Sequence, residues 1–167
     1  LILKRAPTNA SFTWMLDRYS VSLITSIDCM PGTQAPITLG SSNSPEAQAL
    51  RDGVTIVAVP KFNPDGAELN RRQNDFPWDE VTEVFPQFQG FDPPYYYSNG
   101  ARGFDLNRDF NADLDYEPQP ADIPTDETQA GLYLTNESRA LRDLYVDLRA
   151  EFGEVDAYVD LHHMGPC

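Results

Sequence analysis

The sequence has little positive charge and no long apolar run. Its 12 Lys and Arg residues face 26 Asp and Glu residues, which gives a formal net charge of -14. A surface with this charge repels a phosphate backbone or an anionic lipid leaflet, so neither nucleic acid nor a membrane surface is an expected partner. No apolar run approaches the roughly 20 residues that span a bilayer, so we expect no membrane span.

Cysteine and lysine are also scarce. The spacing of the two cysteines, Cys29 and Cys167, matches neither a zinc ribbon nor a redox pair, and the sequence leaves open whether they form a disulfide bridge. Lys4 and Lys61 are the only lysines among the 12 basic residues, so almost every cation is an arginine. Arginine binds carboxylates through two parallel hydrogen bonds, which makes clustered arginines candidates for carboxylate-binding sites.

The overall composition is that of a globular protein. Of the 167 residues 41% are hydrophobic, and the 10 glycines and 14 prolines are scattered along the chain. A chain of this length can bury a sizeable core, so we expect residues 1–167 to form a single domain.

Three segments show the patterns of β-strands. Residues 21–27 and 54–59 are rich in β-branched side chains, and apolar and polar residues alternate over 155–161. The almost unbroken β-branched run at 54–59 is typical of a central strand that is buried on both faces.

Helices are predicted between these strands. A short helix is expected over 45–51 with its end at Gly53, and a longer one over 136–152, where apolar residues recur at helical spacing. Asn136 is expected to cap the start of the longer helix. The order of strands and helices favours an α/β fold with a mainly parallel sheet.

Two long loops are expected, an aromatic and proline-rich one over 75–99 and an acidic one over 111–135. Residues 63–66, Asn-Pro-Asp-Gly, are predicted to form a tight turn after the strand at 54–59, with a role in the scaffold. Ligands of α/β proteins collect beyond the carboxyl ends of the strands. This turn and His162, which follows the last strand, therefore mark the expected site.

Four short motifs occur in a fixed order along the chain. They are Pro-x-x-Asn-Pro-Asp-Gly at 60–66, Arg-x-Asn at 72–74, Gly-Phe-Asp-Leu-Asn-Arg-Asp-Phe at 103–110, and Asp-Leu-His at 160–162. An ordered set is far more specific than any one of these motifs. Over residues 54–163 the chain resembles the zinc metallocarboxypeptidases of the carboxypeptidase A and B type.

The resemblance implies a fold and an activity. The fold would be a mixed, mainly parallel sheet flanked by helices in three α/β/α layers, and residues 1–167 would form an incomplete catalytic domain. The activity would be hydrolysis of the C-terminal peptide bond of peptides or proteins by a zinc-activated water. Many members of the family act outside the cytoplasm, which implies a secreted or otherwise extracytoplasmic location.

The resemblance also implies roles for individual residues. Asn107 and Arg108 match the pair that binds the terminal carboxylate of the substrate. Arg72 matches the arginine that binds substrate, polarises the scissile carbonyl and stabilises the oxyanion, with Arg71 as the alternative if the register is shifted by one residue. His162 matches a zinc ligand, and is the only one of the family's ligands that we can identify.

Asp105 matches the carboxylate that orients another ligand histidine of the family. The motif that would supply such a histidine, His-x-x-Glu, is missing, because residues 1–53 contain no histidine. We expect either that an internal segment is missing or that these ligands have been lost, and that the general-base glutamate lies beyond the last motif. These 167 residues alone should bind zinc poorly and be inactive, with His163 a wall residue rather than a ligand.

Two other functions remain open at this stage. One is a non-catalytic, carboxylate-binding or peptide-binding pseudoenzyme. The other is the same fold acting as an amidohydrolase on acylated amino acids or as a cell-wall peptide hydrolase. The sequence does not indicate the residue preferred at the substrate C-terminus or the oligomeric state.

Overall fold

The computed structural model describes residues 20–26, 40–59 and 61–161. The chain forms two compact units, which are divided between Phe62 and Asn63 and again between Val146 and Asp147. We call residues 63–146 the loop unit and the remainder the sheet unit. None of the helices in the described ranges is long and apolar enough to cross a membrane.

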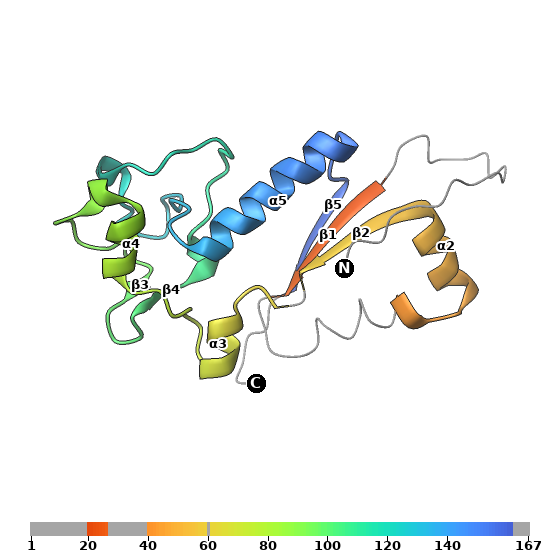
Figure 1. Cartoon of the computed structure of the whole chain (residues 1–167), viewed down its shortest axis with the longest axis horizontal. Helices are drawn as coiled ribbons and strands as arrows, with labels where there is room; N and C mark the ends of the chain where they lie inside the picture. Colours follow the sequence, from red (N-terminus) through yellow and green to blue (C-terminus); the bar gives the residue numbers. More distant parts are fainter. Residues whose placement is uncertain (1–19, 27–39, 60, 162–167) are drawn as a thin grey trace. The chain divides into compact units, whose positions relative to one another are not determined.

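The sheet unit contains three parallel strands (Figure 1). They are β1 (Ser20–Ser26), β2 (Val54–Val59) and β5 (Ala157–Leu161), in the order β2-β1-β5. All three predicted strands and their parallel arrangement are therefore confirmed. Among the described strands β1 is the middle one and β2 is at the edge, contrary to the central place predicted for residues 54–59. Thr55 through Ala58 are nevertheless all buried, so both faces of β2 are covered.

The first described helix of the sheet unit, α2 (Pro45–Gly53), leads directly into β2. It begins where the Ser44 side chain accepts a hydrogen bond from the backbone N–H of Ala47 at 3.2 Å, and Pro45 occupies its first position. This confirms the short helix predicted over 45–51 with its end at Gly53.

The first helix of the loop unit, α3 (Pro64–Leu69), corrects the tight turn predicted at 63–66. The Asn63 side chain caps this helix by accepting a hydrogen bond from Gly66 N at 2.8 Å. Asn followed by Pro is a turn signal, but the same pair also suits the cap and first position of a helix. The scaffold role predicted for these residues agrees with the cap.

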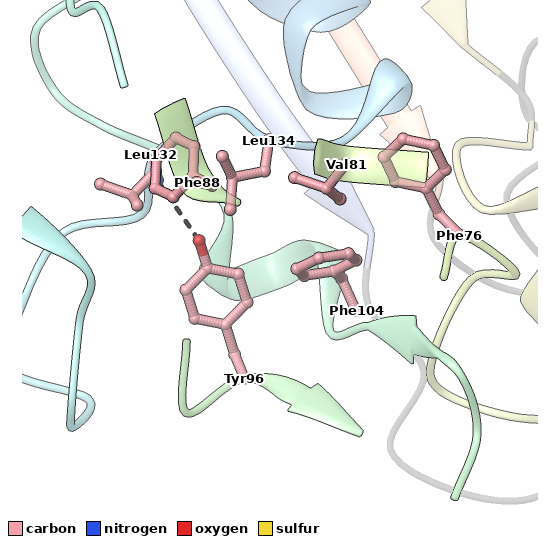
Figure 2. Close-up of a cluster of buried hydrophobic side chains, with 7 residues drawn as sticks. All are labelled: Phe76, Val81, Phe88, Tyr96, Phe104, Leu132 and Leu134. Atoms are coloured by element: carbon pink, nitrogen blue, oxygen red, sulfur yellow. Dashed lines mark hydrogen bonds between the residues drawn. The ribbon is translucent and has the colours of Figure 1, made fainter. Parts of the chain in front are cut away.

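Short elements also replace part of the loop predicted over 75–99. This segment contains α4 (Trp78–Val84), the 3-10 helix η1 (Pro86–Phe88) and β3 (Tyr97–Ser98), which pairs antiparallel with β4 (Gly103–Phe104). Side chains of these elements, most of them aromatic, pack into the core of the loop unit, so packing rather than periodicity determines these elements. Figure 2 shows this core, whose members are Phe76, Val81, Phe88, Tyr96, Phe104, Leu132 and Leu134.

Residues 111–135 are irregular as predicted, apart from the 3-10 helix η3 (Pro120–Asp122). The long helix α5 (Asn136–Phe152) then follows, and it confirms the helix predicted over 136–152. Its cap differs from the prediction, because the hydroxyl of Thr135, not Asn136, accepts a hydrogen bond from Ser138 N, at 3.3 Å. The described elements establish an α/β fold, while the three-layer arrangement and the single domain stay predictions.

Candidate functional site

The two adjacent arginines that follow α3 differ in their contacts. Arg71 is bound within its own loop: its Nε donates to Gln73 O at 3.2 Å, and its Nη2 donates to Asn74 O at 2.6 Å. The same Nη2 forms an ion pair with Asp75 at 2.9 Å. Arg71 therefore stabilises its own loop through Nε and Nη2.

Arg72 reaches across the loop unit to Asp105. Its Nε lies 2.6 Å from Asp105 Oδ2, and 52% of the Arg72 side chain is exposed against 18% of the Asp105 side chain. The other oxygen of Asp105 accepts a hydrogen bond from Asn107 N at 3.2 Å. The Asp105 carboxylate thus connects Arg72 with Asn107. These three residues are among the five that the sequence assigned to the site. Asp105 was predicted to orient a ligand histidine; its contacts here are with Arg72 and the Asn107 backbone.

Asn107 and Arg108 lie on the 3-10 helix η2 (Leu106–Arg108), which begins after the Asp105 cap. Leu106 is buried and anchors this helix. Arg108 is partly exposed, and the one hydrogen bond of its side chain within the described ranges goes to the carbonyl of Asn107 at a long 3.4 Å. Over those ranges Arg108 forms no ion pair. Its positive charge is therefore available for an anionic ligand.

A comparison with protein families now identifies the chain. The family model described as zinc carboxypeptidase matches residues 36–166. The protein belongs to the zinc carboxypeptidase family. The match covers all four ordered motifs, so the resemblance predicted from them is confirmed. No curated protein and no solved structure matches the chain.

The family uses zinc, yet the described residues of this family member do not form a metal site. Nowhere in the described ranges could a group of three or more His, Cys, Asp or Glu side chains hold a metal ion. The predicted ligand His162 and its neighbour His163 lie outside those ranges, as do Cys29 and Cys167. The zinc role of His162 therefore stays a prediction.

Sequence reasoning missed Asp109, the residue that fixes the position of η2. Asp109 is fully buried and accepts five hydrogen bonds at 2.6–3.0 Å. Its donors are the Tyr96 hydroxyl, the backbone N–H groups of Leu134 and Thr135, and the hydroxyls of Thr135 and Ser138. The residue that follows Arg108 is thereby bound to the start of α5.

The surroundings of Asp109 also affect the neighbouring phenol. Burial, and then the negative charge of Asp109, raises the pKa of Tyr96 well above its ordinary value, so the hydroxyl stays protonated and continues to donate. Asp109 belongs to the Gly-Phe-Asp-Leu-Asn-Arg-Asp-Phe motif, but no local pattern indicates its role. Its donors are 13 to 29 residues away in the sequence.

Proposed function

We propose that this zinc carboxypeptidase binds the free C-terminus of a peptide or protein and hydrolyses the last peptide bond. The observation that supports this best is the Asp105 carboxylate, which joins the side chain of Arg72 to the backbone of Asn107. The two motifs that carry arginines meet at this carboxylate, although Arg72 and Asp105 are 33 residues apart in the sequence. An extracytoplasmic location is part of the proposal and is supported by the family resemblance alone.

Each side chain has a role that its contacts permit. Arg108, whose charge is not balanced by a described carboxylate, binds the terminal carboxylate of the substrate, and Asn107 donates a further hydrogen bond. Arg72 is held through Nε, so its Nη1 and Nη2 groups are available for the oxygen of the scissile carbonyl. A preorganised donor at this oxygen stabilises the negative charge that develops in the transition state.

A second function shares the same substrate contacts but lacks the hydrolysis. Residues 1–161 contain no histidine, and this favours a protein that binds a carboxylate-bearing peptide without cleaving it. Turnover distinguishes the two functions, because both require Arg108 for binding but only the peptidase releases an amino acid.

The clamp predicts strong discrimination between a peptide acid and its C-terminal amide. In the amide, the Arg108 charge and nearby donors lose their partner, so we expect affinity to fall by at least about 2 kcal/mol, roughly 30-fold. Calorimetry on the complete protein with one peptide in both forms measures binding, and release of the terminal residue measures hydrolysis. The discrimination should disappear in Arg108→Ala.

Arg102→Ala is the matched control for this experiment. Arg102 directly precedes the 103–110 motif that contains Arg108, and its side chain is exposed. It lies 3.9 Å from Asp79 in a surface ion pair that should contribute little to stability. The Arg102→Ala variant should discriminate between the peptide acid and its amide as well as the unchanged protein does. Equal binding of both peptides by the unchanged protein would contradict the clamp.

Arg72→Ala should reduce turnover far more than binding. Loss of one oxyanion donor typically costs about 2.7 to 4 kcal/mol of transition-state stabilisation, or roughly a factor of 100 to 1,000 in kcat. Steady-state kinetics with a free-acid peptide would measure this loss. A change confined to KM would show instead that Arg72 contributes to ground-state binding only.

A further inference from the structure

Two buried asparagines, Asn63 and Asn74, flank Arg72 in the sequence. Asn63 is 2% exposed and Asn74 is 0% exposed. The Asn63 side chain donates from Nδ2 to the carbonyl of Arg72 at 3.0 Å. Asn74, two residues after Arg72, binds Phe104 in β4 twice: its N donates to Phe104 O at 3.2 Å, and its Oδ1 accepts from Phe104 N at 2.8 Å. The loop that carries Arg72 is therefore fixed on both sides.

The remaining polar group of the Asn74 side chain contacts α5. Its Nδ2 donates to the two carboxylate oxygens of Glu137 at 3.3 and 3.4 Å. Glu137 is partly buried in the first turn of α5, and this burial raises its pKa. The Asn74 amide is the one described side-chain donor to Glu137.

Strand β4 approaches the Arg72 loop as closely as a backbone can. A Cβ atom added to Gly103 would overlap the backbone carbonyl of Asn74, so only glycine fits at this point. Asp105, the partner of Arg72, directly follows β4. Any movement of Asn74 relative to β4 would therefore change the distance between Arg72 and Asp105.

We propose that Asn74 and Glu137 are positioning residues for Arg72. Glu137 orients the Asn74 amide, Asn74 binds the Arg72 loop to β4, and the Arg72 Nε is thereby placed against Asp105. This inference rests on the proposed function only in that Arg72 acts on the substrate.

A reversal of one hydrogen bond tests the proposal. Asn74→Asp keeps the acceptor for Phe104 N but replaces the Nδ2 donor with an oxygen that faces the Glu137 carboxylate. Glu137→Gln alone keeps an acceptor for Asn74. The double variant restores the contact with its direction reversed, because the new Gln side chain donates to the new Asp side chain.

Kinetics on the complete protein provide the first measurement. We expect Asn74→Asp to lower kcat roughly 10- to 100-fold with KM changed less than about threefold, since a small misplacement of an orienting group costs this much. Glu137→Gln should lower kcat less than about threefold, and the kcat of the double variant should return to within about threefold of that of the unchanged protein. Asn70→Asp, which adds the same charge at the exposed end of α3, is the control and should keep its kcat.

The second measurement does not depend on turnover. The N–H signal of Arg72 Nε in a ¹H–¹⁵N spectrum, assigned by its loss in Arg72→Lys, reports the contact with Asp105. It should be shifted or lost in Asn74→Asp and should return in the double variant. If no peptide is hydrolysed, the proposed function fails while this signal still decides the positioning.

Two results would overturn the inference. One is an unchanged Arg72 signal in Asn74→Asp, and the other is a double variant that does not recover it. If Asn74→Asp alone does not fold, the double variant must still fold and show the Arg72 signal of Glu137→Gln.

Discussion

Asp109→Ala is expected to unfold the loop unit. The substitution removes the acceptor of five buried hydrogen bonds. It leaves the Tyr96 hydroxyl and the N–H groups of Leu134 and Thr135, just before α5, without a partner. Each buried donor left unsatisfied costs about 1–3 kcal/mol, so the free energy of unfolding should fall by about 5 kcal/mol or more. This is comparable with the whole stability of a small protein. Hydrogen exchange of the Leu134 and Thr135 amides would measure the loss.

Asp113→Ala is the matched control for Asp109→Ala. Asp113 is an exposed aspartate four residues later, and its side chain accepts a hydrogen bond from Asp115 N at 3.0 Å in a local turn. Water replaces such a bond easily, so the cost should be about 1 kcal/mol or less. Similar exchange rates in the two variants would show that Asp109 does not organise this region.

Gly131→Ala is expected to separate the segments that Asp109 joins. Gly131 is buried, its N–H donates to Phe110 O at 2.8 Å, and an added Cβ atom would overlap the backbone of Arg108, Asp109 and Phe110. Backbone cannot rotate away as a side chain can, so the two segments must move apart. Because the Asp109 hydrogen bonds to Leu134 and Thr135 weaken as well, the free energy of unfolding should fall by about 4 kcal/mol.

Gly100→Ala provides the comparison for Gly131→Ala. An added Cβ atom at Gly100 would have its nearest neighbour, the Ser98 hydroxyl, 4.0 Å away. Its stability should change by about 0.5 kcal/mol or less. Thermal unfolding of both variants gives the difference, and equal melting temperatures would contradict the close approach of the backbone segments. Arg108 should also lose its acid-over-amide preference in Gly131→Ala, because its position depends on this approach.

The parts of the fold that sequence reasoning predicted are those that local patterns determine. The β-branched run at 54–59 and the helical spacing over 136–152 gave the bounds of β2 and α5 to within a residue or two. Residues 75–99 carry no such period, and their elements depend on contacts such as those of Phe88 with Trp78 and Phe85, with ring centroids 5.9 and 6.2 Å apart. A pattern of single residues cannot indicate contacts of this kind.

The candidate site divides in the same way. The motifs give the identity of Arg72, Asn107 and Arg108, because these residues belong to short ordered segments. The motifs do not show that Asp105 binds Arg72 or that Asp109 fixes η2. Those contacts join segments far apart in the sequence, and no periodicity or capping signal accompanies a buried carboxylate with neutral donors.

The contact between Arg72 and Asp105 also restricts which cation this position accepts. A guanidinium has five N–H donors on three nitrogens, and Asp105 uses the one on Nε. Four donors on two other nitrogens remain for a ligand oxygen or for water. A lysine ammonium carries its three donors on one nitrogen at the end of a flexible chain, so binding Asp105 would draw the entire charge to that carboxylate. Lysine at position 72 would therefore keep the net charge of the site but could not hold Asp105 and a ligand from separate atoms.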